Sequence, residues 1–190
     1  MRIISGSARG RKLLAPGQRF GDSVRPTSDR AREAIFSILA VKVVGAQVLD
    51  LFAGTGAMGL EALSRGAELA VFVDGQRSVV ELIGRNIALC DFAERATVLQ
   101  KDLARGLAFL SAQQPIGGFD LVFLDPPYGS KLALRGLESL AGGNFLAAKA
   151  IVVLEDAAEA QYPENMGPLA CFDQRRYGEA GFWLYQHTEG

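Results

Sequence analysis

Histidine and cysteine are scarce in this chain of 190 residues, and their scarcity excludes several kinds of site. The single histidine, His187, lies three residues before the end of the sequence. That position argues against a Ser–His–Asp triad and against a zinc site with histidine ligands. The two cysteines, Cys90 and Cys171, are far apart and form no CxxC motif, so we interpret each as a small buried hydrophobic residue. Chemistry therefore has to come from carboxylates, backbone groups and a cofactor, without a metal ion.

Long apolar runs are also missing. No run approaches the roughly 18 residues of a membrane span, and the opening MRIISGSARGRK lacks the apolar core of a secretory signal. A chain of this length buries roughly 70% of its unfolded surface, so it needs no disulfide or metal for stability. We therefore expect a cytoplasmic protein, monomeric and without membrane contact.

Net charge is close to zero, at −1, but basic residues are concentrated near the start. Residues 1–35 hold eight Lys or Arg against three acidic residues, a charge of +5, whereas the remainder carries 12 basic and 18 acidic residues, a charge of −6. This asymmetry indicates a basic arm on an acidic body, although a solvated basic face would give the same count. We expect one domain over 1–190, with a basic extension over 1–40 and a catalytic core over 41–190.

Short apolar runs alternate with helical patterns through the middle of the chain. The expected strands are 47–52, 69–74, 96–100, 119–124 and 150–155, and the expected helices are 58–64, 78–89, 103–112 and 132–140. Such alternation predicts an α/β fold, a doubly wound Rossmann-like sheet that is mostly parallel and binds ligands at the carboxyl ends of its strands.

Both ends of the sequence differ from this pattern. Near the end, 171–176 and 182–186 flank a turn and predict an antiparallel hairpin. Near the beginning, 2–5 and 11–15 predict a small hairpin, followed by a helix that Thr27 or Ser28 caps and that ends near Ala40.

A glycine-rich loop connects the first expected strand to the following helix. The segment DLFAGTGAMG carries the GxGxxG pattern at Gly54, Gly56 and Gly59, where backbone can approach a ligand closely. Asp74 follows twenty residues after Gly54, at the end of the next strand, where a carboxylate can accept from the hydroxyls of an adenosine ribose. The pattern alone fits NAD, FAD or S-adenosylmethionine.

Two carboxylates favour S-adenosylmethionine over a dinucleotide. Asp50 ends the first strand, where its charge would repel a pyrophosphate and attract a sulfonium cofactor with an ammonium group. Asp102 ends the third strand and can accept from the adenine amine, or it can cap the next helix instead.

The most specific motif is the DPPY turn after the strand at 119–124. Two prolines fix the backbone and contribute no N–H, so the carbonyl of Pro126 can face a ligand beside the Asp125 carboxylate. Together these acceptors can hold both hydrogens of an –NH2 group, free its lone pair and aim it at a methyl donor. Tyr128 offers a ring on which an unpaired or flipped base stacks. The turn therefore indicates methylation of an exocyclic base amine.

These motifs resemble a known family. LDLFAGTG followed by LDPPYG is similar to class I S-adenosylmethionine-dependent amino-methyltransferases. The opening RIISGSARGRKL and the later RPTSDRAREAIFSIL resemble the bacterial RsmD family, the 16S rRNA guanine-N2 methyltransferases, and the similarity extends over nearly the whole chain.

The resemblance implies a role for particular residues of this sequence. The implied cofactor-site residues are Asp50, Phe52, Gly54, Gly56, Asp74 and Asp102. The implied catalytic residues are Asp125, Pro126 and Tyr128. The candidates for RNA contact are Arg9, Arg11, Lys12, Arg25, Arg30 and Arg32. The implied partner is 16S rRNA within a small-subunit particle. After the second strand the family has an acidic, a basic and an acidic residue, whereas this chain has Asp74-Gly75-Gln76. The second acidic residue of the family pattern therefore has no counterpart here.

Other functions remain open at the level of sequence. DPPY and NPPY turns also occur in adenine-N6 and protein-glutamine methyltransferases, and the glycine pattern fits a nicotinamide-dependent oxidoreductase. A fourth alternative is an RNA-binding protein without activity, against which Asp125 argues. For the arginines, the alternative is an ion pair of Arg30 or Arg32 with Asp29 or Glu33.

Overall fold

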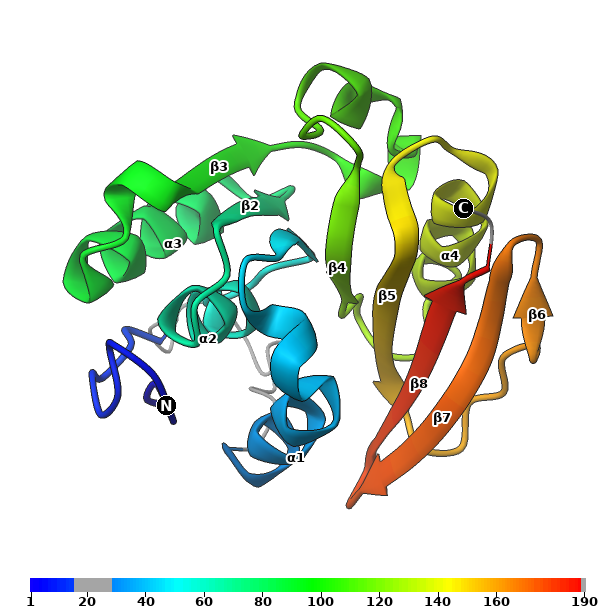
Figure 1. Ribbon diagram of the computed structural model, residues 1–190, viewed down its shortest axis with the longest axis horizontal. Coiled ribbons are helices and arrows are strands. Elements are labelled where there is room, and N and C mark those ends of the chain that lie inside the picture. Colours follow the sequence, from blue (N-terminus) through cyan, green and yellow to red (C-terminus); the bar gives the residue numbers. More distant parts are fainter. Residues whose placement is uncertain (16–28, 189–190) are drawn as a thin grey trace. The chain divides into compact units, whose positions relative to one another are not determined.

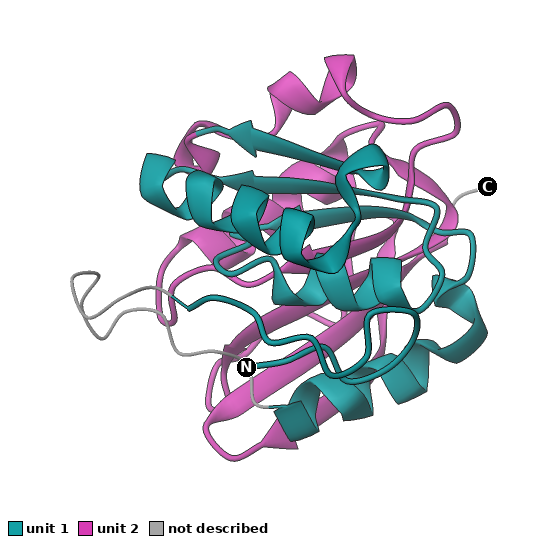
Figure 2. Ribbon diagram, turned by 90° about the vertical axis from the view of Figure 1, so that its left-hand side faces the viewer, with its two compact units in different colours: residues 1–101 teal, residues 102–190 magenta. Residues whose placement is uncertain are grey.

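The computed structural model describes residues 1–15 and 29–188 (Figure 1). The chain divides into two compact units, Met1–Lys101 and Asp102–Gly190 (Figure 2). Each unit contains strands and helices of its own, so the strand–helix alternation predicted from the sequence is confirmed in both.

The first unit is built on three parallel strands in the order β3-β2-β1. Its elements are α1 (Asp29–Leu39), η2 (Ala40–Val43), β1 (Gln47–Leu51), α2 (Ala57–Ser64), β2 (Leu69–Asp74), α3 (Arg77–Cys90), η3 (Ala93–Arg95) and β3 (Ala96–Gln100). Helix α2 packs against β1 and β2, and α3 packs against β2 and β3. Every residue of α2 is buried, because an apolar helix directly after a buried strand lies in the core.

The second unit has five strands in the order β4-β5-β8-β7-β6. Its elements are η4 (Leu103–Arg105), η5 (Ala108–Ala112), β4 (Phe119–Leu124), α4 (Leu132–Gly142), β5 (Leu146–Ala157), β6 (Asn165–Met166), β7 (Leu169–Tyr177) and β8 (Ala180–His187). The β4–β5 pair is parallel and the pairs from β5 onward are antiparallel. The antiparallel C-terminal hairpin predicted from the sequence is thus confirmed as β7 and β8.

In the second unit, two predicted elements differ most clearly from the structure. The helix expected over 103–112 is wrong: two short 3₁₀ helices, η4 and η5, take its place. Gly106 between them has a φ of +87°, which no α-helix contains, while Leu103, Leu107 and Leu110 are still buried. Strand β5 begins earlier than predicted, at Leu146, with a register irregularity in its pairing to β4.

The first residues form a looped segment rather than two regular strands. Arg2 and Lys12 make an antiparallel bridge, and Ile3 N–H donates to the Arg11 carbonyl at 3.0 Å. The predicted hairpin is therefore reduced to one bridge. The proposed caps Thr27 and Ser28 lie outside the described residues, and the helix expected after them is α1.

Within the described ranges, no helix has the length and apolar character needed to cross a bilayer. In the same ranges, no group of three or more His, Cys, Asp or Glu side chains is placed to hold a metal ion.

Candidate functional site

In the first unit, the loop between β1 and α2 has the backbone conformation that its glycines allow. Gly54 and Gly56 have φ values of +54° and +75°, in the left-handed region that side chains disfavour. Phe52 also has a positive φ, +58°, so the chain turns sharply as it leaves β1. The sequence pattern thus produces a tight loop in which Gly54 is partly exposed and Gly56 is buried.

Gly59 serves the packing of this loop. A Cβ at this position would lie 2.4 Å from the Phe72 ring and 3.1 Å from Asp50 Oδ2. The Gly59 N–H donates to Asp50 Oδ2 at 2.9 Å, so the first turn of α2 lies directly against the end of β1. The third glycine of the pattern is therefore required by close packing.

Asp50 is almost fully buried, with 2% of its surface exposed. Burial raises the pKa of its carboxyl to about 7, with the charge of Asp74 adding to the shift and the hydrogen bond from Gly59 opposing it. At neutral pH Asp50 therefore carries only part of a negative charge. The sequence led us to expect that Asp50 repels a pyrophosphate. A partly protonated Asp50 repels it less strongly than a fully ionised carboxylate would.

Asp74 connects the glycine loop to the turn after β2. Its Oδ2 accepts from Gly54 N–H at 3.2 Å and its Oδ1 accepts from Gln76 N–H at 2.9 Å. Burial raises the pKa of Asp74, and the backbone donors oppose that rise. Because an ionised carboxylate has about four acceptor positions, Asp74 retains capacity for further donors such as ribose hydroxyls.

Asp102 lies in the second unit, where it caps η4. Its Oδ1 accepts from Ala104 N–H at 3.1 Å, and its Oδ2 lies 3.4 Å from Arg105 Nε. The capping alternative considered from the sequence is thus present in the structure, and the contact with adenine stays a prediction.

The DPPY turn follows β4 in the second unit. Asp125 is partly buried, Pro126 is buried and the Tyr128 side chain is exposed at its surface. The Tyr128 hydroxyl donates to Glu155 Oε1 at 2.8 Å, and the Gly129 N–H donates to Asp156 Oδ1 at 3.1 Å. The turn is therefore fastened to the end of the neighbouring parallel strand.

The sequence interpretation did not include Glu155 and Asp156, which accept these hydrogen bonds from the DPPY turn. Both are buried, with 5% and 2% of their surfaces exposed, and Asp156 Oδ2 accepts from the Tyr162 hydroxyl at 2.5 Å. Burial raises the pKa of Tyr128, and Glu155 raises it further. The available signal was two adjacent acids at the end of an apolar strand, a position where parallel sheets place ligand sites.

The basic residues proposed for RNA contact have different environments. Arg9, Lys12 and Arg30 are exposed, and Arg11 is exposed with its Nη1 donating to the Leu89 carbonyl. Arg25 lies outside the described residues. These positions leave Arg9, Arg11, Lys12 and Arg30 as accessible candidates.

Arg32 has to be removed from that set. It is fully buried, so it cannot reach a phosphate in solution. Its Nη2 donates to Asp29 Oδ1 at 3.0 Å and to the Arg2 carbonyl at 2.6 Å, and its Nε lies 3.8 Å from Glu61 Oε2. The alternative of an ion pair with Asp29 is therefore the one that the structure contains, and desolvation by burial lowers the pKa of Arg32 while both acids oppose that change.

Comparison with known proteins is consistent with this geometry. The family model described as "Conserved hypothetical protein 95" matches residues 1–186. The chain is 36% identical to "Ribosomal RNA small subunit methyltransferase D" of Escherichia coli strain K12, covering 98% of this chain and 89% of that protein. It is 34% identical to the protein of the same name from Haemophilus influenzae, covering 98% and 94%.

Solved structures of similar proteins have the same fold as this chain. The yhhF protein from Escherichia coli, 36% identical, superposes with a TM-score of 0.83 over 99% of this chain and 98% of that chain. An RNA methyltransferase from Salinibacter ruber, in complex with S-adenosyl-L-homocysteine, shares the fold with a TM-score of 0.61 at 17% identity, over 87% of this chain and 95% of that chain. The mixed α/β architecture is therefore that of the class I methyltransferases.

The match over residues 1–186 and the full-length similarity to the two relatives agree with the motifs in the glycine loop and the DPPY turn. This chain belongs to the family described as conserved hypothetical protein 95, the RsmD family of methyltransferases.

Proposed function

We propose that this protein transfers a methyl group from S-adenosylmethionine to the exocyclic N2 amine of a guanine in 16S ribosomal RNA. The observation that carries the proposal is the DPPY turn after β4, fastened by hydrogen bonds from Tyr128 and Gly129 to the acids that end β5. Support for ribosomal RNA comes from the relatives named ribosomal RNA small subunit methyltransferase D.

The residues of the first unit fit this cofactor. The left-handed glycines let the backbone turn tightly between β1 and α2, and Asp74 has acceptor capacity for the ribose hydroxyls. Asp50 fixes the start of α2 through the hydrogen bond from Gly59. Because its pKa is about 7, the carboxyl ionises near neutral pH, and the ionised form attracts an ammonium group. Phe52 lies in the same loop, and Asp102 is assigned to the adenine amine. When bound, S-adenosylmethionine supplies an electrophilic methyl group on a sulfonium.

The residues of the DPPY turn prepare the nucleophile. A base amine is a poor nucleophile because its lone pair is delocalised into the ring. The Asp125 carboxylate and the Pro126 carbonyl each accept one hydrogen of the –NH2 group, which concentrates the lone pair on nitrogen and orients it. Tyr128 stacks on the base, and Asp125 takes up the proton that the amine loses.

RNA binding is assigned to the accessible basic residues near the start of the chain. Arg9, Arg11, Lys12 and Arg30 contact phosphates, which position the substrate and carry little sequence information. We further propose that the protein acts as a monomer in the cytoplasm on 16S rRNA in a small-subunit particle, with its target base unpaired or flipped.

Replacing Asp125 tests this mechanism directly. We expect Asp125→Ala to abolish methyl transfer while leaving cofactor affinity unchanged, because the side chain holds the amine and not the cofactor. Asp125→Asn keeps an acceptor oxygen but no proton acceptor, so its residual activity separates positioning from proton removal. The measurements are turnover with labelled cofactor and calorimetric cofactor binding. Full turnover in Asp125→Ala would overturn the mechanism.

The substrate is tested with the same labelled cofactor on naked rRNA, assembled small subunits, DNA and protein. We expect label on N2 of a guanine in 16S rRNA, identified by mass mapping of the modified nucleotide. Label on adenine N6 would show that guanine is the wrong base, and label on protein alone would remove RNA as the substrate.

A further inference from the structure

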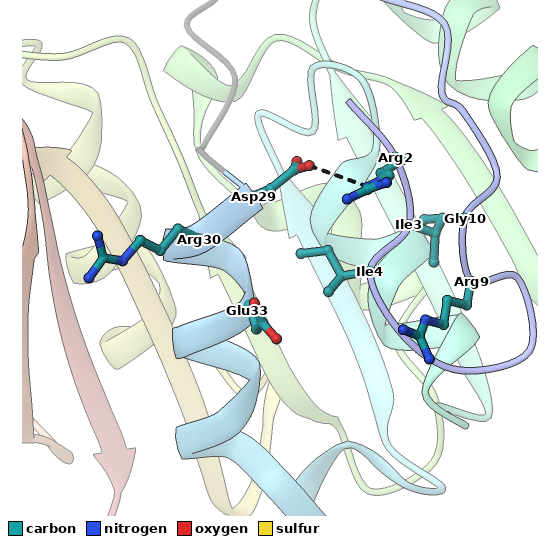
Figure 3. Close-up of a pocket in the computed structure, with 8 residues that line it drawn as sticks. All are labelled: Arg2, Ile3, Ile4, Arg9, Gly10, Asp29, Arg30 and Glu33. Carbon is teal, nitrogen blue, oxygen red and sulfur yellow. Dashed lines mark ion pairs between the residues drawn. The ribbon is translucent and has the colours of Figure 1, made fainter.

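A cleft of about 370 Å³ lies in the first unit, outside the glycine loop (Figure 3). Its volume is within the roughly 300–1,000 Å³ of small-ligand sites. It is lined by residues of two segments, the first ten residues and the start of α1: Arg2, Ile3, Ile4, Arg9, Gly10, Asp29, Arg30 and Glu33. Figure 3 shows Arg9 and Glu33 extending into the space between the two segments, and Arg30 extending away from them.

The N-terminal side of this cleft is held by buried charged residues. Glu61 of α2 accepts from the N–H groups of Ile4 at 2.7 Å and Ser5 at 3.0 Å, and Arg32 of α1 donates to the Arg2 carbonyl at 2.6 Å. Both side chains are fully buried. These hydrogen bonds fix the backbone of the exposed loop that carries Arg2 and Arg9.

Close packing fixes the same loop. Gly6 has a φ of +81°, and a Cβ there would lie 1.8 Å from the Ser64 carbonyl oxygen. Ser7 N–H donates to that oxygen at 2.8 Å, and Ala8 N–H donates to Ser64 Oγ at 3.0 Å. The backbone that carries Arg2 and Arg9 is therefore preorganised, which lowers the entropy cost of binding.

The charges around the cleft are only partly paired. Asp29 is neutralised by Arg32 at 3.0 Å and by Arg2, whose Nε lies 3.9 Å from Asp29 Oδ2. Over the described ranges, no ion pair joins Arg9 or Glu33 to another side chain. The cleft thus offers a cation for a phosphate and a separate carboxylate that only accepts hydrogen bonds.

We propose that this cleft binds one unpaired nucleotide of the RNA, distinct from the methylated base. Arg2 and Arg9 contact the phosphate, and Glu33 accepts N–H groups on the Watson–Crick edge of the base. Guanine fits best, because its adjacent N1–H and N2–H groups match the two oxygens of a carboxylate. The inference rests on the proposed function only in taking RNA as the substrate.

Equilibrium binding of single-stranded RNA tests the phosphate contacts, without cofactor present. We expect the double variant Arg2→Gln/Arg9→Gln to bind at least about tenfold more weakly at low salt. The slope of log K against log salt should become shallower by about 0.7 for each phosphate that the variant no longer neutralises. Lys42→Gln is the matched control: it removes one exposed cation of the same unit, in η2, and does not line the cleft. Its salt dependence should equal that of the parent.

The base contact is tested with Glu33→Gln and two RNAs that differ only in guanine replaced by uracil. We expect the variant to reduce the parent's preference for the guanine RNA about tenfold, while its salt dependence stays unchanged. Circular dichroism establishes folding, since none of these substitutions alters the Arg2 carbonyl or the buried Arg32–Glu61 pair.

Three results would each contradict nucleotide binding in the cleft. The first is a salt dependence of the double variant that equals that of the parent, and the second is an unchanged base preference in Glu33→Gln. The third is that free guanosine monophosphate competes with an affinity equal to that of the RNA. Because no methyl donor is used, these outcomes are separate from the labelled-cofactor assays: absence of methyl transfer to RNA contradicts the proposed function, and equal binding curves contradict only the cleft.

Discussion

Asp50 illustrates how burial changes the chemistry of a single residue. Its position at the end of β1 was expected from the sequence, and its hydrogen bond to Gly59 fixes the start of α2. Burial shifts its pKa from 3.8 to about 7, because a charged carboxylate is poorly solvated in the interior. The residue therefore titrates in the pH range in which enzymes work.

The raised pKa predicts a pH-dependent stability. The native state keeps its proton on Asp50 up to about pH 7, while the unfolded chain loses it near its ordinary value, so the stabilisation is complete below the unfolded pKa and is lost as pH rises through the native one. We expect the free energy of unfolding of the parent to fall by about 2 kcal/mol between pH 5 and 7 relative to Asp50→Asn.

Urea denaturation at pH 5, 6 and 7 measures this difference. Asp91→Asn is the control, because Asp91 is exposed in the same unit and has a left-handed backbone that asparagine also accepts. Its curve should follow the parent. Parallel curves for Asp50→Asn and the parent would show that the native carboxyl is not protonated in this range.

At the scale of elements, the carboxyl ends of β4 and β5 determine the geometry of the DPPY turn. Leu124 pairs with Leu154 in the parallel ladder, so the residues that follow these two positions lie at the same edge of the sheet. That is why Tyr128 can donate to Glu155, although the two are far apart in the sequence. The hydrogen bond restricts the tyrosine side chain, and 38% of the surface of Tyr128 is exposed.

This hydrogen bond predicts a measurable coupling. We expect Glu155→Leu and Tyr128→Phe each to lower kcat/KM about tenfold, because a hydrogen bond to a charged group contributes roughly 1.5 kcal/mol and about 1.4 kcal/mol is a factor of ten. The double variant should be no worse than either single one, since both remove the same interaction. Glu159→Leu, at an exposed surface pair with Arg176, is the control.

Steady-state kinetics with calorimetric cofactor binding provides the measurement. Cofactor affinity should not change in any of the three variants. If the effects of Glu155→Leu and Tyr128→Phe multiply in the double variant, the two side chains act independently and the proposed positioning by Glu155 is refuted.

At the scale of the whole molecule, ligand binding distinguishes the cofactor classes that share the glycine pattern. A ligand that binds only the native state at 100 times its Kd stabilises it by about 2.7 kcal/mol. For a chain of this size, 1 kcal/mol corresponds to about 2–4 °C in Tm. We therefore expect saturating S-adenosyl-L-homocysteine to raise Tm by roughly 5–10 °C, and NAD to leave it unchanged.

Thermal unfolding with each ligand tests this, and Asp74→Ala is the matched variant. It should lose most of the shift with S-adenosyl-L-homocysteine, because the acceptor for the ribose hydroxyls is gone. A shift with NAD and none with S-adenosyl-L-homocysteine would favour the nicotinamide-dependent alternative.

Local patterns in the sequence determined most of the secondary structure of this protein. β2, β3 and β4 have the predicted bounds, because an apolar run between turn residues has few other stable arrangements. The glycine pattern likewise specified its own loop, since left-handed backbone requires glycine. The prediction of an α-helix over 103–112 was wrong for a local reason as well. Its apolar spacing suits an α-helix and a 3₁₀ helix alike, and the left-handed backbone of Gly106 excludes a continuous α-helix.

Only the tertiary structure decided the environments of the charged residues. The sequence around Arg32 predicts an exposed cation, but the side chain is buried against Glu61. The sequence around Glu155 predicts only the end of a strand, but its side chain accepts a hydrogen bond from Tyr128. Solvation and partners depend on residues distant in the chain, and they decide whether a charge binds a ligand, supports the fold or loses its proton. The sequence thus predicted the type of chemistry at the site, and tertiary packing determined what each charged residue contacts.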